Sequence, residues 1–448
     1  MKLLKQFLPL LILPLAAIGA TAQEKQWTLE QCIDYAIENN IEIKAWEYNT
    51  ELKEQALSTS KWSRLPNLNA SVGQGLSFGR TQNRQTNGYD PKNATYTNIG
   101  ISSSMPLFTG GRISNEVAAG KLDVQAALES LNKAKESLAI QVASNYLNVL
   151  FNKELEKVST AQVELSAEQL AKTEILVQAG KVPESQLYDA KALLAKDEMN
   201  LVNAQNDVQL ALLALAQNLE LGLQAESFGV VEPGLVDLAE TLLGSLMLPQ
   251  EIYAQAVLAR PSIKEQEYLL KSSEKQLKAA KSGYYPQLDL AASYGGWYTY
   301  YLKSDNPYSF ADWWNNTYQT VVGVTLNIPL FNRFRVRNNV NTSKINILNQ
   351  SLNLDKSKKD LLDEIQRAYY NAVAAQRKYT SSKESVEAST VSFEYAREKY
   401  DAGRASVFEL NEAKTKMAQS LAEQVQSKYE FIFRTKILDF YRGVKITL

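Results

Sequence analysis

The amino-acid sequence predicts a mostly α-helical chain of mixed α and β class, built as a tandem repeat of one unit. Three observations lead to this fold class. Landmarks of the first half recur in the second half at a constant spacing of 223 residues. Two stretches of 67 residues contain no proline. Each stretch follows two segments in which apolar and polar residues alternate, as they do in strands.

The first residues have the pattern of a secretory signal. Residues 1–22 have a basic start, a short apolar run and small residues from Ala20 to Ala22. A membrane-spanning anchor is the weaker alternative, because the apolar run is short and contains Pro9 and Pro14. We therefore expect a signal peptide that is removed after Ala22.

The composition excludes several functional classes. The 48 basic and 49 acidic residues give a net charge of −1, which argues against nucleic acid as a partner. The chain has no histidine, and Cys32 is its only cysteine. Most routes to nucleophilic catalysis and every His- or Cys-rich metal site are thereby removed. No phosphate-binding or dinucleotide-binding glycine motif occurs. We expect no enzymatic activity and no cofactor.

The repeat defines the domain organisation. The first copy spans 23–221 and the second spans 248–442, with a connector at 222–247 and a C-terminal tail at 443–448. The paired landmarks are Pro106-Leu107-Phe108 with Pro329-Leu330-Phe331, Tyr146 with Tyr369, Ala179-Gly180 with Ala402-Gly403, Leu187 with Leu410, and Ala190-Lys191 with Ala413-Lys414.

Each copy is predicted to contain a helix, two strands, a very long helix and a final helix. In the first copy, Thr28 and Gln31 form a capping box, and the helix that follows ends before Pro66. The remaining elements of this copy are strands 67–79 and 95–108 and helices 112–178 and 183–219. In the second copy the first helix ends before Pro286, and it is followed by strands 287–302 and 318–331 and helices 335–401 and 407–441.

The four strands have the length and pattern of membrane strands. One face of each is mostly apolar and the other is small and polar. About 12 residues at a 45° tilt cover the depth of a bilayer core. Since sheet edges cannot stay unpaired in lipid, four strands would need more than one chain to close a barrel. Soluble hairpins packed on helices are the alternative. The aromatic residues near one strand end resemble an interfacial belt, namely Trp297, Tyr298, Tyr300, Tyr301, Trp313, Trp314 and Tyr318.

Taken together, several segments resemble one known family. They are WTLEQCIDYAIENN near the start, SMPLFTGGR and NIPLFNRFR after the strand pairs, ALESLNKAKESLAIQVASNYLNVL in the long helix, ARPSIKEQE in the second copy, and the two Ala-Gly turns. In this order and spacing they are similar to the TolC family of outer-membrane efflux channels, over nearly all of the chain after residue 22.

The resemblance implies a trimer in the outer membrane, with its helical part in the periplasm. Four strands from each chain would form a twelve-stranded barrel, and the long helices would form an α-helical barrel continuous with it. The far end of the helices would dock a periplasmic adaptor that is linked to an inner-membrane pump. The connector would lie in an equatorial belt. The implied function is passive exit for small molecules or drugs. An outlet for type I protein secretion is the alternative, and a periplasmic scaffold without a pore is a more distant one.

The resemblance also assigns roles to the two turns between long helices. Gly180 and Gly403 suit left-handed positions just after a helix, Pro183 suits the first turn of the next helix, and Ser406 with Glu409 forms a capping box. A well-made helical turn explains these residues without any function. The family instead uses these turns as adaptor-contacting tips, which would be Ala179, Gly180, Lys181, Ala402, Gly403 and Arg404.

By motif position, Glu409 and Glu412 match acidic rings that form the aperture in the family. A helix cap and a solvated face are the plain alternatives for these two residues. Asp189 and Gln186 occupy the corresponding places after the first turn. Tyr400 matches a tyrosine that helps to hold the family's channel closed, but its usual arginine and aspartate partners are replaced by Ala405 and Gln186. Arg404 and Asp189 are the candidate substitutes.

Overall fold

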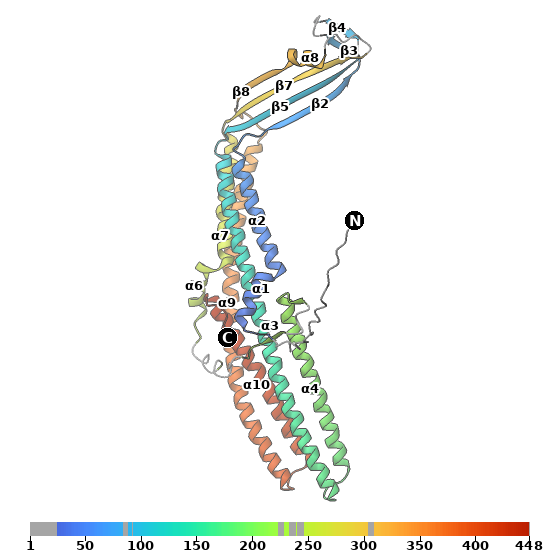
Figure 1. Cartoon of the computed structure of the whole chain (residues 1–448). Coiled ribbons are helices and arrows are strands. Elements are labelled where there is room, and N and C mark those ends of the chain that lie inside the picture. Colours follow the sequence, from blue (N-terminus) through green and yellow to red (C-terminus); the bar gives the residue numbers. More distant parts are fainter. Residues whose placement is uncertain are drawn as a thin grey trace, which may run out of the picture.

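The computed structural model describes residues 25–83, 88–91, 93–222, 228–232, 239, 246–302 and 309–447. The molecule is long and narrow, with a β-sheet at one end and two helix–helix turns at the other (Figure 1). The expected signal peptide, most of the connector and the final residue lie outside the described residues.

The two copies contain the same kinds of element in the same order. In the first copy these are α1 (Leu29–Asn39), α2 (Ile41–Trp62), β2 (Asn69–Ser77), β5 (Ala94–Phe108), α3 (Arg112–Gln178) and α4 (Ser185–Asn218). In the second copy they are α6 (Pro249–Ala259), α7 (Pro261–Lys281), β7 (Gln287–Tyr301), β8 (Gln319–Asn327), α9 (Arg335–Asp401) and α10 (Val407–Tyr441).

The single helix expected at the start of each copy is in fact two helices. Asn40 separates α1 from α2, and its side chain accepts hydrogen bonds from the backbone N–H groups of Glu42 (2.9 Å) and Ile43 (3.3 Å). Arg260 separates α6 from α7 in an extended conformation. Proline disfavours the helical conformation at the residue before it, so Pro261 explains this break.

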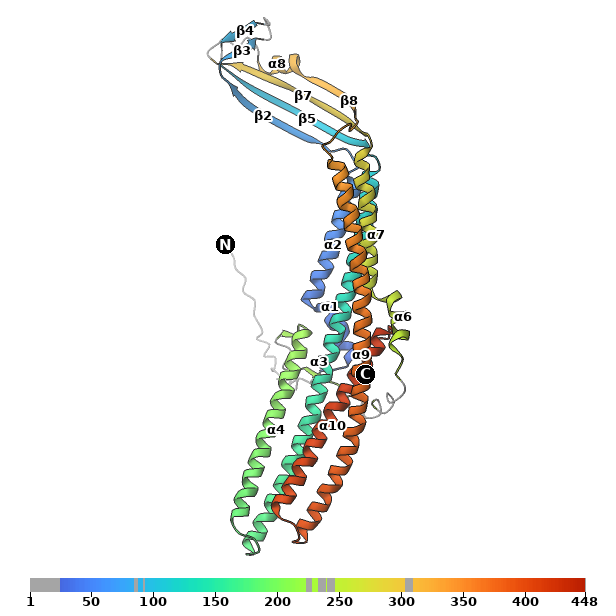
Figure 2. The same ribbon diagram turned by 180° about the vertical axis from the view of Figure 1, so that it is seen from behind.

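The helices α3 and α9 form the framework of the molecule. Each contains 67 residues and is therefore about 100 Å long. Along α3, the helix α2 packs on the half near the sheet and α4 on the other half, while α7 and α10 do the same along α9 (Figure 2). Among the described residues, no helix combines the length and the apolar character needed to cross a membrane.

The four long strands form one antiparallel sheet in the order β2-β5-β7-β8. Both outer strands, β2 and β8, have nine residues. Among the described residues of the chain, each of these two strands pairs along one edge. The sheet therefore ends in two open edges of matched length.

The regions expected as loops beyond the sheet contain further elements. Between β2 and β5 lie β3 (Arg80–Asn83) and β4 (Gly88–Pro91), which pair as a hairpin. Between β7 and β8 lies the short helix α8 (Phe310–Thr317). A capping box of Ser309 and Asp312 begins α8, which is a local signal that the abundance of asparagine and aromatic residues obscured.

The core of the molecule surrounds the middle of α3. There β1 (Lys25–Trp27) pairs in parallel with β6 (Phe228–Val230), so the connector is tied to the N-terminal segment. The hydroxyl of the buried Tyr146 lies 2.7 Å from the carbonyl oxygen of Val231. Burial raises the pKa of this phenol, which keeps its proton available for donation. The C-terminal segment is also more than a tail, because Ile446 is buried in this core.

The two copies enter their long helices through the same backbone conformation with different residues. Gly110 and Gly111 both have positive φ before α3, and Arg333 and Phe334 do so at the repeat-equivalent positions before α9. A side chain in this conformation is strained by about 1–2 kcal/mol. The first copy has close packing here, since a Cβ on Gly110 would lie 2.8 Å from the Cβ of Tyr285.

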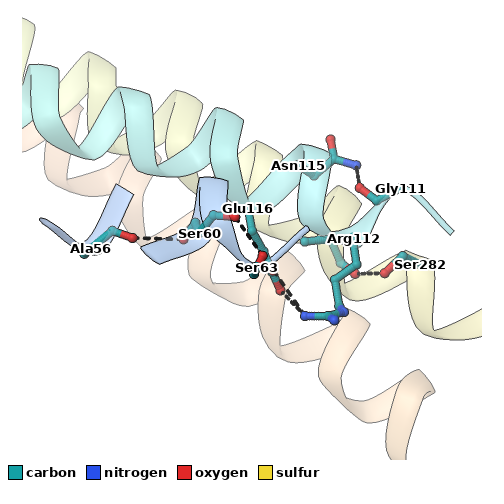
Figure 3. A network of polar contacts seen from close by, with 9 residues as sticks. Ala56, Ser60, Ser63, Gly111, Arg112, Asn115, Glu116 and Ser282 are labelled. Atoms are coloured by element: carbon teal, nitrogen blue, oxygen red, sulfur yellow. Dashed lines mark hydrogen bonds and ion pairs between the residues drawn. The ribbon is translucent and has the colours of Figure 1, made fainter. Parts of the chain in front are cut away.

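The junction below the sheet joins α2 and α3 to the turn that ends α7 (Figure 3). The Asn115 side-chain amide donates to the Gly111 carbonyl oxygen (2.9 Å), and Arg112 forms an ion pair with Glu116 (3.0 Å). Arg64, in the segment after α2, donates a hydrogen bond to the Ser114 hydroxyl near the start of α3 (3.2 Å). The start of α3 is thus fixed by local polar contacts.

The core around the middle of α3 gives a first prediction. Tyr146→Phe removes the donor to the carbonyl oxygen of the half-buried Val231 and should lower the free energy of unfolding by about 0.5–1.5 kcal/mol. Its repeat counterpart Tyr369 is half-buried, and Tyr369→Phe is the matched control. Chemical unfolding followed by circular dichroism measures both variants. Equal losses of unfolding free energy in the two variants would show that the Tyr146 hydrogen bond does not stabilise the core around α3.

Candidate functional site

The two turns at the end remote from the sheet have one geometry. The N–H of Lys181 donates to the Leu176 carbonyl oxygen (2.9 Å), and the N–H of Gly180 donates to that of Val177 (2.9 Å). Gly180 has a φ of +66°. This is the Schellman arrangement, which satisfies the last carbonyl groups of a helix and requires a left-handed residue.

The second turn repeats these contacts after α9. Arg404 donates to the Lys399 carbonyl oxygen (2.8 Å) and Gly403 to that of Tyr400 (3.0 Å), with a φ of +70° at Gly403. All six residues expected at the tips are exposed, and a Cβ on either glycine would meet no atom within 4 Å. The tips are Ala179, Gly180, Lys181, Ala402, Gly403 and Arg404. They therefore form small, open surfaces at the end of the molecule (Figures 1 and 2).

After the first tip the following helix starts later than predicted, whereas after the second tip α10 begins at Val407 as predicted. The helix α4 begins at Ser185, so Pro183 lies outside it, and the backbone turns around Pro183 instead. At the second tip, the Ser406 hydroxyl accepts from the Glu409 N–H (3.2 Å) as expected. The reciprocal bond of the expected capping box, from the Ser406 N–H to the Glu409 carboxylate, does not form.

Glu409 and Glu412 lie on the exposed face of α10. Leu410 and Met417 on the opposite face are buried among Phe393 and its neighbours. The exposed face continues with Lys416, Gln419 and Glu423 at helical spacing. Among the large apolar side chains of α10, only Phe408 at its start is exposed. This face of α10 is therefore polar along more than three turns.

The other candidate aperture residues occupy different environments. Tyr400 is half-buried and packs against the cluster of Phe393, Leu410 and Met417. Gln186 is half-buried, and its Oε1 atom is buried without a hydrogen-bond partner. Asp189 is exposed. Among the ion pairs between described residues, none joins Asp189 to Arg404, so the substitute pair considered from the sequence does not form within one chain.

Other ion pairs hold the two helical hairpins together near the tips. Lys172 on α3 pairs with Asp401 on α9, and Arg397 on α9 pairs with Glu168 on α3. The four side chains are 44–60% exposed. The sequence does not predict these contacts, because one exposed charge on a long helix gives no information about its partner on another helix.

A buried polar cluster lies between the hairpins, further from the tips. The Lys414 ammonium on α10 lies 2.8 Å from the Asp197 carboxylate on α4 and 3.2 Å from the Gln162 carbonyl oxygen on α3. The Ser166 hydroxyl accepts from Lys414 and donates to Asp197. The Lys414 side chain is only 6% exposed. All three of its donors are used, which is the condition for burying an ammonium group.

A signal for this cluster was present in the sequence. Lys414 lies between Leu410 and Met417 on the buried face of α10, where an apolar residue is the usual choice. Its repeat counterpart Lys191 is exposed on α4. The two equivalent lysines therefore differ in burial, and only Lys414 lies at a core position.

The sheet at the other end has two chemically distinct faces. The strand register pairs Val72 with Ile99, Met105 with Leu290, and Leu290 with Val324. Directly paired residues share a face, so the apolar side chains of all four strands lie together. We name this the apolar face. The opposite face contains mainly small or polar residues from the same strands: Ser71, Gly73, Gly75, Asn98, Gly100, Ser102, Ser293, Gly295, Gly323 and Thr325.

The expected membrane-interface aromatics divide between the two faces. Tyr298 and Tyr300 are on the apolar face, while Trp297 alternates onto the opposite face. Trp313 and Trp314 belong to α8. Their rings contact the apolar face, at 6.1 Å from Tyr298 for Trp313 and 6.1 Å from Tyr294 for Trp314.

Known proteins share this architecture. TolC of Escherichia coli (strain K12) is 24% identical over 441 residues, which cover 96% of this chain and 84% of TolC. The cation efflux system protein CusC of Escherichia coli O157:H7 is 23% identical, over 85% of this chain and 78% of CusC. The crystal structure of the Campylobacter jejuni CmeC outer membrane channel has a TM-score of 0.74 at 19% identity, covering 94% of this chain and 87% of CmeC.

The family model for outer membrane efflux proteins matches residues 32–219 and 252–432. These two segments correspond to the two copies of the repeat and include all four strands of the sheet, the first helical hairpin, and the second hairpin up to residue 432 of α10. The chain belongs to the outer membrane efflux protein family.

Proposed function

We propose that three copies of this chain form one continuous duct through the outer membrane and the periplasm. Each copy contributes four strands to a closed barrel and two helical hairpins to a helical tunnel. The duct is passive, and an inner-membrane pump drives the cargo into it through a periplasmic adaptor that binds the tips.

The observation that carries this proposal is the four-stranded sheet with two open edges. Backbone groups in lipid must all be hydrogen-bonded within the protein, so an open edge is excluded there. In a barrel of several copies, β2 of one copy would pair with β8 of the next, and these strands have equal length. The apolar face would then contact lipid, and the small polar face would line the interior.

The helical hairpins support assembly in the same way. The outward face of α4 contains exposed apolar residues at helical spacing, namely Tyr188, Met199, Val202, Leu210 and Leu213. An apolar stripe of this length on a helix is normally buried against another helix. In the proposed trimer, the partner of this stripe is a hairpin of the neighbouring copy.

The polar face of α10 supports a water-filled interior. It contrasts with the apolar stripe of α4, although the two helices are repeat counterparts. In the proposed trimer this α10 face lines the tunnel. Glu409 and Glu412 then form two acidic rings near the tips, and their negative potential favours cations.

We propose small molecules as the cargo. The relatives named for cation efflux and the channel fold support an export duct, and they favour it over a scaffold without a pore. Protein secretion would instead require an open tunnel wide enough for a polypeptide. The adaptor-binding surface is formed by the exposed tip residues, where glycine leaves room for a partner backbone.

Purification and reconstitution test the assembly and the pore together. The full-length protein should be recovered from outer membranes as a trimer and should give discrete conductance steps in planar bilayers. A monomer without conductance would contradict the proposal. Protection from drugs in a channel-deficient strain, rather than restored secretion of a protein substrate, would support small molecules as the cargo.

The acidic rings give a prediction about ion selectivity. The double variant Glu409→Gln and Glu412→Gln should reduce cation preference and weaken block by divalent cations, because six carboxylates leave the narrowest part of the trimer. Reversal potentials in a salt gradient measure the change. Glu198→Gln removes one exposed carboxylate per chain from α4 of the other hairpin and is the control. Unchanged selectivity in the double variant would show that Glu409 and Glu412 do not form the acidic rings that select cations.

The exposed ion pairs between hairpins give a prediction about the resting state. The double variant Lys172→Ala and Arg397→Ala should raise the conductance of the resting channel, since these two residues form the ion pairs that join α3 to α9 at this level among the described residues. The cost in stability should be small, at about 0–1 kcal/mol for each exposed pair.

The control for this experiment is Arg367→Ala. Arg367 pairs with Asp363 one turn earlier on the same helix (2.8 Å), so its loss breaks an ion pair without separating two hairpins. Conductance and thermal stability should be measured on all variants. An equal rise in conductance for the control, or no rise for the double variant, would exclude the ion pairs as a restraint on opening.

A further inference from the structure

The proposed barrel uses the four long strands of the sheet and does not require the helix α8. It leaves the end of β7 that is remote from the long helices, and it lies against the sheet there (Figures 1 and 2). Two strands of an antiparallel pair can be joined by a short turn. The extra helix therefore needs a separate explanation.

The aromatic side of α8 is packed on the apolar face of the sheet. Phe310 lies 5.5 Å from Tyr298, and Trp314 lies 6.1 Å from Tyr294, measured between ring centroids. The Thr317 hydroxyl donates to the Trp297 carbonyl oxygen (2.8 Å). These contacts hold α8 against β7 along its whole length.

Gly296 of β7 makes this close approach feasible. It is on the apolar face, directly opposite Ile99. A Cβ at this position would lie 3.2 Å from two ring carbons of Trp314 and 3.1 Å from the Thr317 hydroxyl oxygen. Glycine therefore provides the space into which α8 fits.

The other side of α8 is polar and exposed. Asp312, Asn315 and Asn316 lie on it together with Ala311. In the proposed barrel the apolar face of the sheet meets lipid tails, and a carboxylate with two amides would be costly at that depth. The polar side of α8 can be accommodated only where the tails end and the headgroups begin.

We propose that α8 is an interfacial helix that contacts the polar headgroups of the outer lipid leaflet and sets the depth of the barrel in the membrane. This inference rests on the proposed barrel. It changes the role of Trp313 and Trp314, since their rings bind the barrel wall. The residues that meet the headgroups are Asp312, Asn315 and Asn316.

Spin-label accessibility in the full-length trimer tests this placement. Single cysteines at Asn316, Val322 and Lys181 would carry a nitroxide, with the protein in vesicles of phosphatidylethanolamine and phosphatidylglycerol. Burial raises the pKa of the native Cys32 thiol to about 12, so this residue does not compete for the label. Oxygen reports contact with lipid tails, and a water-soluble nickel chelate reports contact with water.

We expect the label at Val322 to collide mainly with oxygen, because this side chain is 69% exposed on the apolar face. The label at Lys181 should collide mainly with nickel. The label at Asn316 should give values between these two. If Val322 behaves like Lys181, the proposed barrel is wrong. If the label at Val322 collides mainly with oxygen and the label at Asn316 collides mainly with nickel, as at Lys181, the barrel is supported and the proposal of an interfacial helix is wrong.

Two variants show whether packing on the sheet holds α8 at this depth. Gly296→Val should push α8 away, and Trp314→Ala should loosen it without adding bulk. Both should raise nickel accessibility at Asn316 several-fold. Gly323→Val is the control, since a Cβ there meets no atom within 4 Å. No change at Asn316 in either variant, with the trimer intact, would show that this packing does not position the helix.

Discussion

The organisation proposed for this protein depends on the need to hydrogen-bond every backbone group of a sheet placed in lipid. One chain provides only four strands, and β2 and β8 each leave one edge open. In the proposed barrel, the N–H and C=O groups of these edges pair with another copy of the same sheet. Three other features agree with this requirement: the register that gathers apolar residues on one face, the small residues on the other, and the apolar stripe on α4. In a monomer these features would leave apolar surface and strand edges exposed to solvent, whereas in the proposed assembly they are covered by lipid or by another copy.

The sequence predicted the elements whose signals are periodic and long. Absence of proline over α3 and α9, and alternation along the strands, reflect rules that act on every residue of an element. Interruptions were harder to predict. Asn40 ends one helix and begins the next with its own side chain, and asparagine within a helical pattern is too common to indicate a break. The helix α8 was missed because eight residues are too few for a periodic signal.

Contacts between hairpins were beyond the sequence for a different reason. A charge such as Arg397 has many acidic residues within reach along a helix of 67 residues, and its partner Glu168 is 229 positions away. The candidate aperture residues rest on the family resemblance and on their distance from the turns. The structure adds that Glu409 and Glu412 are exposed while Tyr400 packs inward, which separates residues that can face water from those that stabilise the hairpin.

The duplication explains why asymmetry is informative here. Lys414 and Lys191 are equivalent in the repeat, but only Lys414 is buried, with the Asp197 carboxylate and the Ser166 hydroxyl as partners. Replacing a buried ion pair by apolar residues of similar volume is often neutral or stabilising, so stability alone does not explain this cluster. Its geometry does, because the three donors of one ammonium reach α3 and α4 from α10 and are satisfied in only one relative position of the two hairpins. An apolar contact would tolerate sliding between the hairpins. The buried ammonium instead defines their register, above exposed ion pairs that can break at little cost.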